Sequence, residues 1–253
     1  MKSTGQTQDL FDSEPSATAS ACGVRRKDGI TDAGLAHFAD FYTEQRVAQG
    51  ECQSISKEDV FYYIYGLLHS EDYKTRYADN LTKELPRIPR VKKYADFIAF
   101  VQAGRALAEL HVNYENVPMY PVNFVGGALA VKGLEDKDFY VTKMKFGKGS
   151  GVDEDGKAIK YDKTTVIYNA KITMTDIPLE AYDYIVNGKP ALEWVMERQS
   201  VSTHKDSGIV NDANDWAIET MGNARYPLEL FQRVITVSIE TMKIVNGLPK
   251  LDI

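Results

Sequence analysis

The chain has 253 residues, a formal net charge of −6, and hydrophobic, aromatic and charged fractions of 43%, 11% and 26%. These fractions are close to globular averages, so the chain can bury a sizeable core, and a largely disordered chain is excluded. The acidic balance argues against a uniformly basic nucleic-acid-binding surface, although an average can hide local basic patches.

The N-terminal part of the chain predicts a leader followed by a helix. Residues 1–24 are rich in Ser, Thr, Gly and Gln and show no apolar period, which indicates a flexible leader or linker. Ser56 followed by Asp59 resembles a capping box, and apolar residues then recur at helical spacing. We therefore expect a helix over about residues 57–69.

Two more helices are predicted in the first half of the chain. Ser70 can cap a helix whose apolar residues fall four apart as far as Leu85, and Pro86 would end it. Residues 94–114 repeat the helical pattern. Residues 25–116 are accordingly predicted to form a helical coupling unit.

After Pro121 the sequence changes to β-branched and aromatic runs interrupted by glycines. The clearest runs are residues 139–146 and 164–174. Asp155 and Gly156 between them form a dipeptide typical of a hairpin turn. An antiparallel pairing of the two runs is expected.

Helical patterns return in the last third of the chain. Residues 179–186 have apolar residues at helical spacing and are followed by Asn187 and Gly188, which would end a helix. Pro190 stands where a first-turn proline can open the next helix. A last helix is expected over about residues 227–246.

These elements predict an α+β fold, with an N-terminal helical unit followed by a mixed, mainly antiparallel β-sheet with flanking helices. Residues 117–253 would form the α+β unit. One face of the last helix is predicted to be buried through Phe231, Val234, Ser238, Thr241 and Val245.

The cysteines and the termini carry no sign of a metal site or of secretion. Cys22 and Cys52 are not in a CxxC pair and have no paired histidines, so neither a disulfide scaffold nor a zinc site is indicated. There is no run of about 18 apolar residues and no signal-peptide pattern in residues 1–23. We expect a cytoplasmic protein without a membrane partner.

Two glycine-rich segments resemble nucleotide-binding loops but do not meet their chemical requirements. Residues 151–158 nearly match GxxxxGK[ST], but three acidic residues would repel a phosphate and Ala158 lacks the hydroxyl that binds magnesium. Residues 146–151 are not followed by a helical pattern that could supply a helix N-terminus. The first segment is predicted to be a hairpin turn; the second is either a solvated turn or a basic loop tip that approaches DNA.

Two groups of cations are candidates for contacts with phosphates, and a solvated surface patch is the alternative for each. A stiff connector contributes the first group, and a strand with its loop contributes the second. They are Arg87, Arg90, Lys92 and Lys93 in the connector, and Lys143, Lys145 and Lys148 in the strand and loop. Acidic residues outnumber basic ones in residues 170–253, so this third of the chain is predicted to face away from a duplex.

The segment 202–207 holds hydroxyl, imidazole and carboxylate groups, but sequence neighbours seldom converge as a catalytic triad. A polar loop is favoured, and Thr203, His204 and Lys205 are secondary candidates for contacts with bases. The remaining histidines, His37, His69 and His111, have no metal-ligand spacing and are assigned to packing. No motif of a base methyltransferase, nuclease or metalloprotease occurs, so no catalytic residue is predicted.

Three long stretches together resemble the C-terminal specificity region of type ISP restriction-modification enzymes. They are RRKDGITDAGLAHF (25–38), ISKEDVFYYIYGLLHSEDYKTRYADNLTKELPRIP (55–89) and IPLEAYDYIVNGKPALEWVMERQSVSTHKDSGIVNDANDW (177–216), and AGRALAELHVNYE (103–115) is similar to a helix of such proteins. Members of that family join nuclease, helicase-like translocase, methyltransferase and target-recognition parts in one chain. No base contact can be transferred residue by residue.

The resemblance implies sequence-specific recognition of double-stranded DNA by a non-catalytic specificity domain. Its partners would be DNA and the methyltransferase and helicase-nuclease parts of a parent enzyme, which would use ATP, magnesium and S-adenosylmethionine; no cofactor is expected in this chain. Two alternatives stay open. The chain could be a structural coupler that docks neighbouring domains without base contacts, or an enzyme fragment that binds a nucleotide or S-adenosylmethionine.

Overall fold

The computed structural model describes residues 28–51, 54–152 and 156–253. The chain divides into two compact units, Met1–Val60 and Phe61–Ile253. The predicted leader, residues 1–24, lies outside the described residues, and the predicted boundary between residues 116 and 117 falls inside the second unit. The three-part division of the chain stays a prediction.

The first unit contains helix α1, Asp32–Ala48, and the start of α2, Lys57–His69. Thr31 caps α1 by accepting a hydrogen bond from the N–H of Gly34 at 3.1 Å. The capping box predicted for α2 is confirmed, because the Ser56 N–H donates to Asp59 Oδ2 at 2.8 Å and the Asp59 N–H donates to Ser56 Oγ at 3.1 Å. The predicted limits of α2 are confirmed as well.

The helix predicted from Ser70 to Leu85 is wrong in its second half. Ser70 does cap a helix, α3, but this helix covers only Glu71–Arg76. Tyr77 separates it from the single turn α4 (Ala78–Leu81), and the chain is no longer helical at Leu85. The Leu85 side chain is 89% exposed, so the end of this segment has no core to pack against. Tertiary packing decides helix length where propensity alone is marginal.

Helix α5, Tyr94–Val112, confirms the third predicted helix and crosses α2 at two glycines. A Cβ atom on Gly104 would lie 1.8 Å from the Tyr62 carbonyl oxygen, and one on Gly66 would lie 2.4 Å from the Phe100 carbonyl oxygen. The two helix backbones are therefore in direct contact, which only glycine at both positions permits.

The main sheet is antiparallel and has the strand order β1-β4-β3-β2. Its strands are β1 (Asn123–Phe124), β2 (Lys145–Lys148), β3 (Tyr161–Ile167) and β4 (Thr173–Thr175). The register pairs Lys145 with Ile167 and Lys148 with Tyr161, with an irregularity between Phe146 and Gly147. The predicted antiparallel pairing is confirmed, and Asp155 of the predicted turn lies outside the described residues.

The limits of the two predicted strands need correction. The first run becomes extended only at Lys145, because a 3₁₀ turn, η2 (Asp136–Phe139), and an irregular segment precede it. The second run is itself a hairpin, β3 to β4. Its turn is set by Asn169, whose side-chain oxygen accepts the N–H groups of Lys171 and Ile172, both at 2.9 Å.

The helix predicted over residues 179–186 is also wrong. Only one 3₁₀ turn, η3 (Leu179–Tyr182), forms, and the chain then makes a hairpin from β5 (Ile185–Val186) to β6 (Lys189–Pro190). Asn187 and Gly188 have φ angles of 49° and 78°, so they form a primed hairpin turn rather than a helix end. The next helix is α7 (Ala191–Arg198), with Pro190 at its N-cap.

Another antiparallel pair, β7 (Val201–Thr203) and β8 (Val210–Asp212), follows α7 and leads into α8 (Ala213–Glu219). Helix α9 (Tyr226–Asn246) confirms the predicted last helix and buries the predicted face. It packs against α5, α7, α8, η3 and the 3₁₀ turn η1 (Tyr114–Asn116). Short helix α6 (Ala128–Lys132) lies beside β1.

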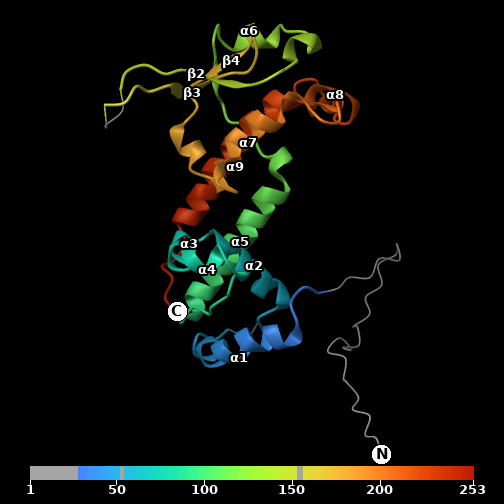
Figure 1. The fold of residues 1–253 in the computed structure, drawn as a ribbon. Helices are drawn as coiled ribbons and strands as arrows, with labels where there is room; N and C mark the ends of the chain where they lie inside the picture. The colour runs from blue at the N-terminus through green and yellow to red at the C-terminus, as the bar shows by residue number, and fades with distance from the viewer. Residues whose placement is uncertain (1–27, 52–53, 153–155) are drawn as a thin grey trace, which may run out of the picture. The chain divides into compact units, whose positions relative to one another are not determined.

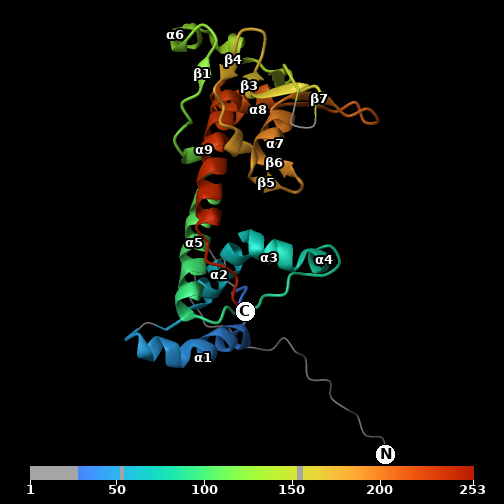
Figure 2. The ribbon, with the colours of Figure 1, turned by 90° about the vertical axis from the view of Figure 1, so that its left-hand side faces the viewer.

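The second unit is thus organised along α9, which runs beside α5 and α7 in both ribbon views (Figures 1 and 2). Its larger core joins the sheet, η3 and α7 to the first half of α9. The predicted α+β class, with helices first and a mainly antiparallel sheet after them, is confirmed. Within the described residues, no helix has the length and apolar character needed to cross a membrane.

Candidate functional site

The basic connector, residues 87–93, is fixed through its backbone. The Tyr73 hydroxyl donates to the Arg87 carbonyl at 2.7 Å, and the Tyr63 hydroxyl donates to the Pro89 carbonyl at 2.7 Å. The Lys92 N–H donates to the Asp252 carbonyl at 2.8 Å. Two buried tyrosines and the C-terminal segment therefore set the course of the connector.

The connector cations differ in how far they are engaged. Arg87 pairs with Glu84 at 2.9 Å, and Lys92 pairs with Asp252 at 2.8 Å. Arg90 is half-buried, whereas Lys93 is exposed and forms no ion pair with any described residue. Lys93 is therefore the connector cation whose charge is most available to a phosphate.

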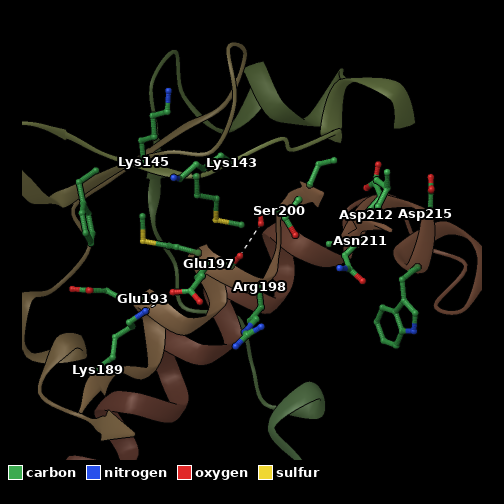
Figure 3. A pocket seen from close by; sticks show the side chains of 18 of the residues that line it. Lys143, Lys145, Lys189, Glu193, Glu197, Arg198, Ser200, Asn211, Asp212 and Asp215 are labelled. Atoms are coloured by element: carbon green, nitrogen blue, oxygen red, sulfur yellow. Dashed lines mark hydrogen bonds and ion pairs between the residues drawn. The ribbon is translucent and has the colours of Figure 1, made fainter. Parts of the chain in front are cut away.

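The second basic group borders an open groove of about 1520 Å³. The groove lies between the segment entering β2, helix α7, the β7–β8 hairpin and α8 (Figure 3). Apolar side chains contribute to its lining, but most of the lining residues are polar or charged: Lys143, Lys145, Lys163, Lys189, Arg198, Glu193, Glu197, Asp212, Asp215, Ser200, Ser202 and Asn211. Figure 3 shows Lys143 and Lys145 on one side of the groove and Asn211, Asp212 and Asp215 on the other.

Some charges in the groove neutralise one another. Lys163 pairs with Glu193 at 2.9 Å, and Lys189 pairs with Glu197. The Lys189 ammonium holds the pKa of Glu197 below its usual value. Acidic residues of the C-terminal third thus line the same groove as Lys143 and Lys145. The acidic and basic segments are separate in the sequence, but the fold brings them together.

Lys143 and Lys145 stand between this groove and a second, smaller hollow. The second hollow has a volume of about 450 Å³ and is lined by both lysines together with Lys137, Asn169 and Lys171. Lys171 pairs with Asp138 at 2.5 Å, whereas neither Lys143 nor Lys145 forms an ion pair within the described part of the chain. The two lysines form a positively charged ridge without an ion pair among the described residues, although the charge of Lys143 acts on the nearby Glu197 carboxylate. Lys148 lies further along β2 and is exposed.

The segment that carries this ridge is held by side chains and backbone from distant elements. Asn214 of α8 accepts a hydrogen bond from the Val141 N–H at 2.8 Å and donates to the Val141 carbonyl at 2.9 Å. The Val201 N–H of β7 donates to the Thr142 carbonyl at 2.9 Å. Val141 is fully buried, so the backbone that leads to Lys143 is rigidly placed.

The secondary candidates lie at the exposed end of the β7–β8 hairpin. Thr203 pairs with Val210 at the end of the ladder. His204 Nδ1 lies 3.0 Å from Ser207 Oγ, and among the described residues no carboxylate contacts the imidazole. His204 and Lys205 are exposed, and none of the three candidates lines the groove. The segment has the geometry of a polar hairpin tip, as predicted.

The glycine-rich segment 146–151 continues the β2–β3 pairing. The Gly149 N–H donates to the Lys160 carbonyl at 3.1 Å, and the Ile159 N–H donates to the Gly151 carbonyl at 3.1 Å. A Cβ on Gly149 would lie 2.2 Å from the Ile159 carbonyl oxygen, which explains the glycine. Among the described residues this segment is followed by strand β3, so no helix supplies an N-terminus to it.

Sequence reasoning identified only Lys143 and Lys145 among the groove residues. The others come from separate elements and include Lys163, Lys189, Arg198, Asn211 and Trp216. Trp194 does not line this groove; its indole N–H donates to the Val186 carbonyl at 2.7 Å, and Lys189 lies 4.3 Å from its ring centre. No spacing along the sequence connects these residues. Only the tertiary fold brings them to one place.

Comparisons with known proteins give a family match and solved relatives. The model of the type ISP C-terminal specificity domain matches residues 2–232. A nuclease-deletion mutant of the type ISP restriction-modification enzyme LlaGI, in complex with a DNA substrate mimic, is 39% identical with a TM-score of 0.64, over 79% of this chain and 17% of that chain. No curated protein matches.

Two further structures are similar. The ATP-dependent type ISP restriction-modification enzyme LlaBIII, bound to DNA, is 36% identical with a TM-score of 0.65, over 82% of this chain and 12% of that chain. A DrdV–DNA complex is 30% identical with a TM-score of 0.62, over 88% of this chain and 20% of that chain. The chain therefore spans a fifth or less of the length of these relatives.

Proposed function

The chain belongs to the type ISP C-terminal specificity domain family, and on that premise we propose that it recognises a specific sequence in double-stranded DNA. The solved relatives are complexes with DNA or a DNA mimic, which supports a duplex as the ligand. In this role the chain makes no covalent bond. It directs the chemistry of other parts of a longer enzyme to one site.

The observation that carries this proposal is the lysine ridge beside the groove. Lys143 and Lys145 are exposed, form no ion pair among the described residues, and project from a backbone that Asn214 and Val201 hold in place. Phosphate contacts fix the register of a protein on DNA, and base contacts then supply specificity. A rigid basic ridge next to a groove lined by polar and apolar side chains would supply both kinds of contact.

The connector supplies a second place where phosphates could be held. Trp216, which lines the groove, packs edge to face on Tyr226 at the start of α9, with ring centres 5.3 Å apart. Lys92 of the connector instead pairs with Asp252, beyond the end of α9. With 21 residues α9 is about 30 Å long, so the connector and the groove lie at opposite ends of one helix. A duplex along this axis could reach both groups, and the connector contact stays a proposal.

We assign the catalytic steps to the rest of the longer enzyme. DNA cleavage, translocation and methyl transfer, with their ATP, magnesium and S-adenosylmethionine, would belong to parts outside this chain, and those parts would be its protein partners. The length of the relatives supports this division, because the chain covers only a small share of each.

Selection of bound duplexes from a random pool tests the proposal. A DNA-specificity domain enriches one short sequence. A structural coupler that never touches bases enriches none, even if it binds DNA through its lysines. Calorimetry with ATP and with S-adenosylmethionine completes the comparison, since an enzyme fragment would bind one of them and the proposed domain binds neither.

A further inference from the structure

One wall of the groove is a two-stranded ribbon, the β7–β8 hairpin. Its ladder pairs Val201 with Asp212, Ser202 with Asn211, and Thr203 with Val210. Because neighbouring pairs alternate between the faces of a ribbon, Ser202 and Asn211 share one face and Thr203 and Val210 share the other. Figure 2 shows this hairpin extending past the rest of the unit, beyond the β7 label.

The base of the ribbon is anchored directly beside Asn211. The next residue, Asp212, caps α8 by accepting the Asn214 N–H at 2.8 Å, and the Tyr140 hydroxyl donates to its other carboxylate oxygen at 2.8 Å. Both carboxylate oxygens of Asp212 are therefore engaged within the protein. The backbone at Asn211 is therefore fixed, while Asp212 stays a charged carboxylate, because both groups that donate to it are neutral.

The amide of Asn211 is not engaged in this way. Its side chain is exposed, lines the groove and makes no hydrogen bond with any described residue. Other asparagines of the same unit use their amides to hold the fold: Asn123, Asn169, Asn214 and Asn223. Asn211 thus has an unused donor and acceptor on a rigid support that faces the groove.

We propose that Asn211 is a specificity-determining residue that reads an adenine in the major groove. An asparagine amide can accept from the N6 amino group of adenine and donate to its N7, and a two-stranded β-ribbon fits the major groove. Lys143 and Lys145, across the groove, hold the backbone of the same duplex.

This inference rests on the proposed function, and its test separates the two. Duplexes are selected from a random pool by the full chain, by Asn211→Ala and by the control Asn80→Ala, which changes an exposed asparagine on α4. Asn211→Ala should relax the preference at one adenine position and weaken binding to the selected duplex roughly tenfold to a hundredfold. Its affinity for unrelated duplexes, and the behaviour of Asn80→Ala, should match those of the unchanged chain.

A modified base identifies the contact itself. Replacing the read adenine by 7-deazaadenine removes the N7 acceptor, which should weaken binding by the unchanged chain and leave binding by Asn211→Ala unaffected. If Asn211→Ala keeps the full base preference at every position, the inference is overturned while the proposed function stands. If the unchanged chain enriches no sequence at all, the proposed function fails, and this inference fails with it.

Discussion

The side chain of Asn214 satisfies both backbone hydrogen-bonding groups of Val141, at 2.8 Å for the N–H and 2.9 Å for the carbonyl. The asparagine is 4% exposed and Val141 is fully buried, so no solvent competes for these bonds. The Asn214 side-chain amide therefore makes the two hydrogen bonds that a neighbouring β-strand would make with Val141. It joins α8 to the segment that places Lys143 at the groove.

Removing this amide should destabilise the fold and weaken DNA binding together. Asn214→Ala leaves a buried backbone N–H and carbonyl without partners, and each such group costs about 1–3 kcal/mol. We expect the free energy of unfolding, measured with urea, to fall by about 2 kcal/mol or more. The control, Asn116→Ala, changes an exposed asparagine and should unfold like the unchanged chain. Equal stability of Asn214→Ala and the unchanged chain would show that the clamp is dispensable.

Lys143 and Lys145 should contribute affinity without specificity. The double variant Lys143→Ala/Lys145→Ala should bind all duplexes more weakly and lower the slope of log affinity against log salt by about one unit for each lost phosphate contact. The matched control, Lys83→Ala/Lys132→Ala, removes two exposed lysines that line neither hollow. An unchanged salt slope in the first variant would remove the ridge from the DNA interface.

The crossing of α2 and α5 predicts an unusual cost for an alanine. Gly→Ala in a helix ordinarily stabilises by about 1 kcal/mol, but at Gly104 the added Cβ would lie 1.8 Å from the Tyr62 carbonyl oxygen. We expect Gly104→Ala to lower the free energy of unfolding by about 3 kcal/mol, measured by thermal or urea unfolding, or to prevent folding. Gly133→Ala is the control, because its Cβ would meet nothing closer than 3.9 Å. A Gly104→Ala chain as stable as the original would contradict the close crossing.

A half-buried imidazole joins three helices and should make stability depend on pH. His111 of α5 contacts the Tyr65 hydroxyl of α2 and Thr241 Oγ1 of α9, both at 2.8 Å, and stacks on Tyr184 with ring centres 5.4 Å apart. Burial, with a smaller effect of His69, lowers the pKa of His111 to about 4. Burial also lowers the pKa of His69. Both rings are therefore neutral in the folded protein at pH 7.

The sign of the effect follows from proton uptake on unfolding. An unfolded histidine titrates near 6.5, so between about pH 6.5 and 4 the unfolded chain binds protons that the folded chain excludes, and stability falls as the pH falls. Allowing for partial solvent access, His111 should account for about 1–2 kcal/mol of this loss. Urea unfolding at pH 7.5, 6, 5 and 4.5 measures it. His111→Gln should make the free energy of unfolding depend less on pH. An unchanged pH dependence in this variant would show that other groups cause the loss of stability.

The sequence predicted the elements that local chemistry determines. The capping box at Ser56 and Asp59 marked the start of α2, and the long apolar face of α9 marked the last helix. Helix α1 was not predicted, although Thr31 caps it and Phe38 and Tyr42 are buried at helical spacing. That signal was present in the sequence and could have been used.

The errors have physical causes beyond the local pattern. Short apolar runs such as Ile185–Val186 suit a helix or a strand equally well, and the positive φ angles at Asn187 and Gly188 decided for the hairpin. The groove could not be predicted, because Lys143, Lys189 and Asn211 meet only through tertiary packing. The basic ridge was found because its lysines are close in sequence.

Discrimination between DNA sequences is the property that defines a specificity domain. The decisive measurement is the ratio of dissociation constants of the chain for its selected duplex and for a shuffled duplex of equal length and composition, at about 0.15 M salt. A specificity domain should bind the selected duplex at least about a thousandfold more tightly. A ratio near one, with binding that vanishes equally for both duplexes as salt rises, would contradict sequence recognition and favour a structural coupler.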